Sequence, residues 1–178
     1  MSELERLIQE HCPNGVEFKP LEKCCQVLDK KRKPITKSAR EAGEYPYYGA
    51  NGIQDYVADY IFEGTFVLVG EDGSVMTSNG NPVVNWAEGK IWVNNHAHIL
   101  ESNGKCDIRY ICYLLNKMDI SGYITGSAQP KLNQANLCSI EVELPDIQAQ
   151  KRIAEFIGNF DDKIELNRQI NDNLALTA

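Results

Sequence analysis

The sequence lacks the short motifs that mark the common enzyme classes. It has no Gly-x-Gly-x-x-Gly or Walker-type loop to cradle a phosphate, and no Gly-x-Ser-x-Gly segment to carry a nucleophilic serine. Asn81-Pro82-Val83-Val84 begins like the Asn-Pro-Pro-aromatic motif of amino-methyltransferases, but the second proline and the aromatic residue are absent. Asp and Glu residues are scattered and do not pair as in a nuclease. We therefore predict a binding module with no catalytic residue, rather than an enzyme.

Long apolar runs and metal-binding cysteine pairs are lacking as well. No apolar run reaches the roughly 20 residues that span a bilayer, and no charged-then-apolar leader stands at the N-terminus. The six cysteines include no Cys-x-x-Cys pair, and His11-Cys12 is more simply a coincidence than a metal site. We therefore expect a cytoplasmic chain with reduced thiols, no bound metal and no membrane partner.

The charge of the chain is acidic overall but uneven. A formal net charge of −7 argues against indiscriminate nucleic-acid binding. Lys30-Lys31-Arg32-Lys33 nevertheless form a basic run, with Lys37 and Arg40 following. Such a local basic face permits DNA binding if other subunits supply further positive charge. We predict that Lys31, Arg32 and Lys33 contact DNA phosphates.

The segment Tyr45–Ile53 places three tyrosines beside an Asn51-Gly52 pair, which is typical of a tight hairpin turn. Tyrosine rings can stack on bases or sugars, and their hydroxyls can contact phosphate. We predict Tyr47, Tyr48 and Asn51 as contacts to base edges or backbone. The alternative is that the rings belong to the core and the turn is only a turn.

Two further polar segments carry groups that suit nucleic acid. Gln129 and Lys131 present an amide and an ammonium in a loop that follows Gly126, and we predict both as contacts to base or phosphate. His96 and His98 share one strand face and could read bases or phosphates. Their spacing also fits a metal, but the sequence suggests no third ligand, and structural hydrogen bonding is the alternative role.

Short β-rich runs between Gly and Asn turns predict a twisted, largely antiparallel or mixed sheet. The runs are Val16–Phe18, Thr65–Val69, Val83-Val84, Ile91–Val93, His98–Leu100 and Ile140–Leu144. Short helices are expected at residues 2–11 and from the cap Asp107 to about Lys117, and Leu21–Leu28 is expected as a short helix or turn. We predict an α+β (mixed) fold, with a globular domain at residues 1–146 and one long projecting C-terminal helix at residues 147–178.

The long helix is the strongest local signal. From Gln148 to about Leu176 the chain has no proline and one glycine. Its length, about 43 Å at 1.5 Å per residue, exceeds what a domain of this size needs. Asn167 and Asn171 take positions where a strict seven-residue repeat would place apolar groups, as in register-fixing seams. The helix either lies across its own core or docks a second chain. For docking we predict contacts at Ile153, Ile157, Phe160, Ile164, Ile170 and Leu174.

Four segments together resemble the DNA-specificity subunits of type I restriction-modification systems, specifically one target recognition domain with its following conserved helix. They are Tyr45–Ile53, Glu63–Gly73, Asn94–Leu100 and Gly126–Ile153, and with the rest of the helix they span nearly the whole chain. The sequence departs from the family at residues 145–147 and 149–150. Pro-Asp-Ile and Ala-Gln stand there in place of the usual Pro-Pro-Leu and Glu-Gln. Similarity to the specificity domains of single-chain adenine methyltransferases is weaker.

The resemblance implies a non-catalytic, sequence-specific DNA-binding subunit that reads one half of a split target in double-stranded DNA. It implies that modification (methyltransferase) subunits dock on the helix and bind S-adenosylmethionine. Restriction subunits would add ATP- and Mg-dependent cleavage, so this chain itself would bind no cofactor. One recognition domain and one helix indicate a half-subunit or a fragment. Two copies could then form a homodimer through their helices and read a palindromic split target. The alternative is a non-catalytic helical scaffold without direct DNA readout.

Overall fold

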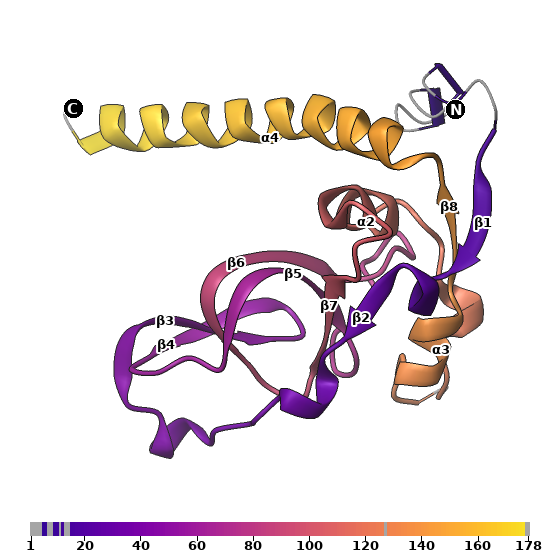
Figure 1. Cartoon of the computed structure of the whole chain (residues 1–178). Coiled ribbons are helices and arrows are strands. Elements are labelled where there is room, and N and C mark those ends of the chain that lie inside the picture. The colour runs from indigo at the N-terminus through magenta and orange to yellow at the C-terminus, as the bar shows by residue number, and fades with distance from the viewer. Residues whose placement is uncertain (1–4, 7–8, 11, 13–14, 127, 177–178) are drawn as a thin grey trace.

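A curled six-stranded sheet, a small two-stranded sheet and one long helix make up the architecture (Figure 1). The computed structural model describes residues 5–6, 9–10, 12, 15–126 and 128–176. The helix predicted at residues 2–11 overlaps the undescribed residues and lies outside this description. Within the described ranges, no helical stretch combines the length and the apolarity that crossing a bilayer requires.

The six-stranded sheet is largely antiparallel, as the sequence predicts. In sheet order its strands are β2 (Cys25–Val27), β7 (Ala97–Ser102), β5 (Phe62–Gly70), β6 (Val84–Val93), β3 (Ala42–Gly49) and β4 (Gly52–Val57). All neighbouring strands run antiparallel except β3 and β6, which pair in parallel through Tyr47 with Trp92 and Tyr48 with Val93. The α+β (mixed) fold class is therefore confirmed.

The two-stranded sheet and the short helices cover one face of the six-stranded sheet. Strands β1 (Glu17–Pro20) and β8 (Glu141–Leu144) pair antiparallel beside the helices α2 (Ile108–Leu115) and α3 (Gln134–Ser139). Asp107 caps α2 as predicted, since its carboxylate accepts the Tyr110 N–H at 2.9 Å. Single 3₁₀ turns occur at η1 (Leu21–Lys23), η2 (Asp29–Lys31), η3 (Lys37–Ala39) and η4 (Ser121–Tyr123).

Strand β5 divides the core because its side chains alternate between the two faces of the sheet. Val67 and Val69 pack with α2, α3 and the start of the long helix. Phe66 and Leu68 point into the curl of the sheet, where the Phe66 ring meets Phe62 edge-on at 5.8 Å. One apolar run thus supplies two hydrophobic clusters and holds the sheet between them.

Helix α4 (Ile147–Leu176) begins on the domain and then leaves it (Figure 1). Asp146 caps its start by accepting the N–H groups of Gln148 and Ala149, both at 2.9 Å. The first turns pack on α2 and bury Ala149, Ile153 and Ala154. From residue 159 to residue 174 every residue is exposed.

Three local predictions differ from the structure. Leu21–Leu28 forms a 3₁₀ turn and then strand β2 in place of one short helix or turn. Val84 of the first predicted run and the run at 91–93 belong to one strand, β6, in which Gly89 (φ +82°) lies opposite Gly64 (φ +152°) and the two glycines let the pairing continue. Helix α3 forms within a segment that the sequence indicates as a polar loop.

Candidate nucleic-acid interface

Four segments distant in sequence meet where β5 ends and β7 begins, and we call this place the loop junction: residues 29–33, 70–73, 94–98 and 125–132, the last described except for residue 127. Backbone hydrogen bonds join them, from Glu71 N–H to the His96 carbonyl at 2.8 Å and from Leu132 N–H to the Glu71 carbonyl at 2.9 Å. Lys33 N–H reaches the Val93 carbonyl at 3.3 Å. The junction includes the basic run and the loop of Gln129 and Lys131, which the sequence predicts separately.

His98 lies at the centre of the loop junction and is 0% exposed. Its Nδ1 lies 2.5 Å from Asp29 Oδ2, and its Nε2 lies 2.7 Å from the Leu132 carbonyl. The other oxygen of Asp29 accepts the Ile99 N–H at 3.0 Å. Of the alternatives for His98, structural hydrogen bonding therefore describes its position, and a direct contact to bases is ruled out by its burial.

Arg32 is directed inward although it belongs to the basic run. Its side chain is 13% exposed, and its Nη1 donates to Glu71 Oε2 at 2.6 Å and to the Ala97 carbonyl at 2.8 Å. Nη2 lies 3.3 Å from Asp29 Oδ2. The guanidinium is thus used to join the 3₁₀ turn η2 to the start of β7 and the loop after β5.

Lys131 and His96 form the outer layer of the junction. Lys131 Nζ lies 3.1 Å from Glu71 Oε1 and 3.8 Å from Asp72 Oδ2, and its side chain is 46% exposed. His96 Nδ1 contacts Asp72 Oδ1. Burial would raise the pKa of Glu71, but hydrogen bonds from Arg32 and Lys131 outweigh it and hold that pKa below its ordinary value. The hydrogen bond to Glu71 in turn raises the pKa of Lys131.

The same cluster contains the third ligand that the sequence does not suggest for a metal. Ligand atoms of Asp29, Glu71 and His98 lie within 4.8 Å of one another. The Arg32 guanidinium, however, already contacts both carboxylates, and His98 Nδ1 faces Asp29. A divalent cation would have to displace this internal cation, so the arrangement is best described as a neutralised ion-pair cluster.

The hairpin of β3 and β4 adjoins the junction through Asn94, whose N–H donates to the Tyr48 carbonyl at 3.0 Å. Tyr47 is 1% exposed, and its hydroxyl lies 3.0 Å from the Ile35 N–H and 3.3 Å from the Ile35 carbonyl. Tyr48 is also buried, whereas Asn51 is exposed at the predicted turn. The rings of Tyr47 and Tyr48 therefore belong to the core.

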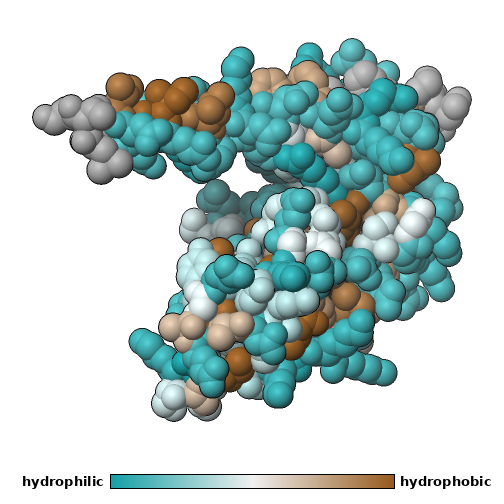
Figure 2. Space-filling model, turned by 60° about the vertical axis from the view of Figure 1, so that its left-hand side comes forward, coloured by the Kyte–Doolittle hydropathy of each residue, from teal (hydrophilic) through white to brown (hydrophobic). Residues whose placement is uncertain are grey.

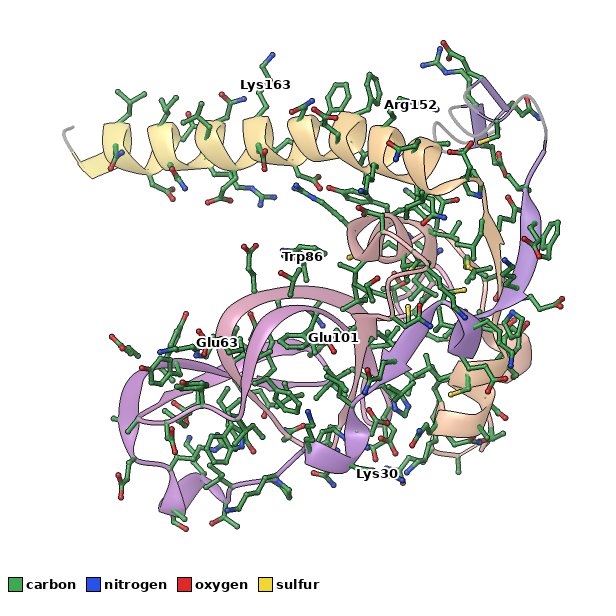
Figure 3. All side chains as sticks on the ribbon, in the orientation of Figure 1. Lys30, Glu63, Trp86, Glu101, Arg152 and Lys163 are labelled. Carbon is green, nitrogen blue, oxygen red and sulfur yellow. The ribbon has the colours of Figure 1, made fainter. Side chains whose placement is uncertain are left out.

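The structure separates the predicted DNA contacts by exposure. Lys31, Lys33, Asn51, Gln129 and Lys131 are exposed, whereas Arg32, Tyr47 and Tyr48 are largely buried. Contact with DNA stays a prediction for all of them, but the buried residues can act only by holding the exposed ones. Figure 3 shows Lys30, next in the basic run, at the edge of the molecule opposite α4.

Sequence reasoning missed the acidic residues that organise the junction. Asp29 stands directly before a basic run, and Glu71 lies in a Gly-Glu-Asp-Gly turn, so both are expected on the surface. Their partners come from segments 39 to 69 residues away along the chain. The spacing of His96 and His98 predicts one shared strand face, but β7 begins only at Ala97 and His96 lies in the turn before it, so only His98 is enclosed.

Helix α4 carries a second surface, apolar and directed away from the domain. Figure 2 shows hydrophobic atoms gathered on the upper side of its far part, above hydrophilic ones. The exposed large apolar residues of α4, which we call the α4 stripe, are Phe156, Phe160, Ile164, Leu166, Ile170 and Leu174. The rings of Phe156 and Phe160 stack edge-on at 5.2 Å. Among the predicted interface residues, Ile157 is half-buried against the core.

Ile153 requires a correction. The sequence assigns it to the interface, but its side chain is 0% exposed in the core of its own domain, so it has no surface left for another chain. The three-four spacing places Ile153 and Ile157 on one face of the helix, and this face packs on α2 and is distinct from the α4 stripe. The first turns of the helix lie on the core and the rest projects, and docking of a second chain on the projecting part stays a prediction.

The seat of α4 on α2 is fixed by polar contacts. Tyr113 O–H donates to Asp161 Oδ2 at 2.6 Å, and Arg109 Nη2 lies 3.5 Å from Asp162 Oδ1. Burial and the hydrogen bond to Asp161 raise the pKa of Tyr113 to about 12. Gly158 allows the close approach, because a Cβ there would lie 2.8 Å from Arg109 Cζ.

Comparison with known proteins identifies the combination of this domain and helix. Residues 13–176 match the family model described as the type I restriction modification DNA specificity domain. A putative type I restriction enzyme specificity subunit of Haemophilus influenzae is 38% identical over 154 residues, covering 86% of this chain and 39% of the relative. The EcoprrI specificity subunit of Escherichia coli is 29% identical, covering 71% of this chain and 30% of the relative. The chain thus spans well under half the length of these relatives.

Solved structures support the same fold. The S subunit of a type I restriction-modification system from M. genitalium superposes with a TM-score of 0.74 at 18% identity, covering 97% of this chain and 46% of that one. The HsdS subunit of Thermoanaerobacter tengcongensis gives a TM-score of 0.57 at 14% identity, covering 94% of this chain and 44% of that one. These likenesses concern the fold alone.

Proposed function

Because the chain belongs to the type I restriction modification DNA specificity family, we propose that it reads one half of a split target in double-stranded DNA. The exposed side chains around the loop junction would make the contacts, with Lys31, Lys33 and Lys131 on phosphates and Asn51 and Gln129 on base edges. Specificity subunits are non-catalytic, and membership confirms the prediction of such a subunit rather than an enzyme.

The observation that supports this proposal is the separation of two unlike surfaces. Lys31, Lys33, Gln129 and Lys131 are exposed in segments of the loop junction, and Lys30 lies at the edge opposite α4 (Figure 3). Apolar side chains gather instead on the far part of α4 (Figure 2). A polar surface suits nucleic acid and an exposed apolar stripe suits another protein chain. One molecule can therefore hold DNA and a protein partner at once.

We assign the α4 stripe to a second copy of the chain and the remaining helix surface to the modification subunits. Asn167 and Asn171 interrupt the stripe, and such polar positions fix register in helix pairs. An antiparallel pair would place the two recognition surfaces in two-fold symmetry, so that the target is palindromic with a fixed spacer. S-adenosylmethionine, ATP and Mg belong in this scheme to the modification and restriction subunits.

Selection from a random duplex pool tests the proposal. The full chain is purified with a modification subunit encoded beside it and incubated with random DNA at moderate salt, and the retained DNA is sequenced. We expect two short blocks separated by a constant spacer, and Lys131→Ala should weaken their retention. Retention of the protein partner with no enriched sequence would instead support the alternative, a helical scaffold that does not read DNA.

Methylation sequencing of the source genome, with and without this gene, provides the matching test in the cell. A motif that loses methylation only in the deletion strain should contain the two blocks found by selection. Loss of methylation at a motif unrelated to the selected blocks would contradict the assignment of readout to this chain.

A further inference from the structure

His98 is the most deeply buried titratable group of the loop junction, and both of its ring nitrogens face acceptors. Nε2 points at the Leu132 carbonyl oxygen, which can only accept, so this nitrogen carries hydrogen. Nδ1 points at Asp29 Oδ2 at 2.5 Å. The proton of this second contact lies either on His98 Nδ1 or on Asp29 Oδ2.

The surroundings of Asp29 favour a donating Nδ1. Asp29 Oδ1 already accepts the Ile99 N–H at 3.0 Å, and Oδ2 also lies 3.3 Å from Arg32 Nη2. These donors stabilise a carboxylate and oppose a neutral acid. A carboxylate at Asp29 leaves Nδ1 to supply the hydrogen, so both ring nitrogens are protonated.

Charge balance in the cluster leads to the same result. Asp29 and Glu71 contribute two negative charges, and Glu71 Oε2 lies 3.7 Å from His98 Nδ1. Arg32 contributes one positive charge inside the cluster, and Lys131 lies on its solvent side. An imidazolium at His98 gives the two enclosed carboxylates two enclosed cations, whereas with a neutral ring the second carboxylate would be balanced only by Lys131 from the solvent side.

We propose that His98 is a buried imidazolium that acts as a positioning residue, with one N–H holding the 125–132 loop through the Leu132 carbonyl and the other holding the basic run through Asp29. The exposed lysines on these two segments thereby keep one fixed separation. The proposal deepens the DNA-reading function and rests on it only for what the two segments contact.

The first test needs no variant and no DNA. Full-length chain labelled with ¹⁵N-histidine is studied near neutral pH by long-range ¹H–¹⁵N correlation of the imidazole rings. We expect both ring nitrogens of His98 to show the protonated pattern. His96, exposed and paired with Asp72, is the internal comparison. An unprotonated Nδ1 or Nε2 at His98 would overturn the proposal.

The second test asks whether the ring holds the loop. His98→Gln keeps a donor at only one end of the side chain, its amide NH2 group, and removes the charge. His96→Gln is the matched control, since that ring lies two residues away and is 51% exposed. We expect His98→Gln to speed amide hydrogen exchange of Thr125, Lys131 and Leu132 on the order of tenfold, the effect of losing one charge-assisted hydrogen bond. Exchange in β6 should not change, and His96→Gln should change neither region. Unaltered amide exchange of the loop in His98→Gln would count against His98 as a positioning residue, as would equal acceleration of exchange throughout the chain.

A third measurement, of duplex affinity, asks whether the positioning by His98 matters for DNA binding. If the two segments lose their fixed separation, His98→Gln should lower the affinity for selected duplex by about tenfold and leave affinity for random duplex nearly unchanged. A uniform loss on both duplexes would contradict positioning. Because the ring and exchange measurements use no DNA, they can fail while DNA readout stands, and DNA readout can fail while they succeed.

Discussion

The loop junction and the far part of α4 differ in how their side chains are satisfied. At the junction, polar side chains of three segments are enclosed and paired with one another and Lys131 of the fourth pairs with Glu71 from the solvent side, so the chain satisfies its own polar groups there. Along α4 beyond Gly158, apolar side chains remain exposed, and Phe160 is 54% exposed. Isolated helices gain little stability from propensity alone, so such a helix benefits from a second surface. The comparison teaches that the polar groups of the junction are paired within the chain, whereas the apolar side chains of α4 are left exposed for the partner proposed above.

The largest effect is expected from a charge placed on the α4 stripe. Ile164→Asp puts a carboxylate where a second helix would pack. We therefore expect the dissociation constant of the dimer to rise on the order of 100-fold, as for the loss of an interface hot spot. Sedimentation velocity over a range of concentrations measures this. Gln169→Asp adds the same charge to a different face of the helix and should have little effect. An Ile164→Asp protein that stayed dimeric would remove the stripe from the interface.

The next effect concerns the junction alone. Glu71→Gln removes a carboxylate that accepts from Arg32 and Lys131, so we expect a loss of about 2 kcal/mol in the free energy of unfolding near neutral pH. Because the folded-state pKa of Glu71 lies below its ordinary value of 4.5, its contribution is present above that value and is lost as pH falls through the folded pKa.

Urea unfolding of both proteins at neutral and acid pH tests this dependence. The difference between wild type and Glu71→Gln should shrink on acidification. A difference that stays constant down to the lowest pH at which both fold would show that the carboxylate charge contributes nothing.

Smaller effects are expected from the exposed lysines beside the junction. Lys31→Ala and Lys33→Ala each remove one cation that the structure leaves exposed. We expect each change to reduce the slope of log affinity against log salt by about one and to weaken selected and random duplex alike. Fluorescence anisotropy over a salt series measures the slope. Lys117→Ala, an exposed lysine after α2, is the control and should leave the slope unchanged.

The smallest effect is expected at the seat of the helix. Gly158→Ala improves helix propensity by about 1 kcal/mol, but its Cβ would lie 2.8 Å from the guanidinium carbon at the far end of the Arg109 side chain. These contributions oppose each other, so the free energy of unfolding should change by less than about 1 kcal/mol. Thermal unfolding measures it. A large loss would show that Arg109 is held too firmly to move.

The sequence predicts the two regions unequally well, for physical reasons. The α4 helix follows from local signals, namely good helix formers, no interior proline and a regular apolar spacing, so its existence and most of its exposed face are predicted. Ile153 is assigned to the wrong partner because periodicity shows that a face is apolar but not which surface covers it. The junction depends on pairings such as Asp29 with His98, which are 69 residues apart and leave no periodic trace. Arg32 and Lys31 are adjacent in sequence and differ only in which of them finds a carboxylate.

Because the first turns of α4 pack on α2, a small tilt there moves the projecting end of the helix by a larger distance. Residues 159–176 extend about 27 Å beyond Gly158 at 1.5 Å per residue. A tilt of about 7° at the contacts of Asp161 and Asp162 with α2 would move the tip by about 3.4 Å, the rise of one base pair. If two copies read a split target as proposed, the tolerance for targets one base pair longer or shorter would depend on how firmly Tyr113 and Arg109 hold these contacts.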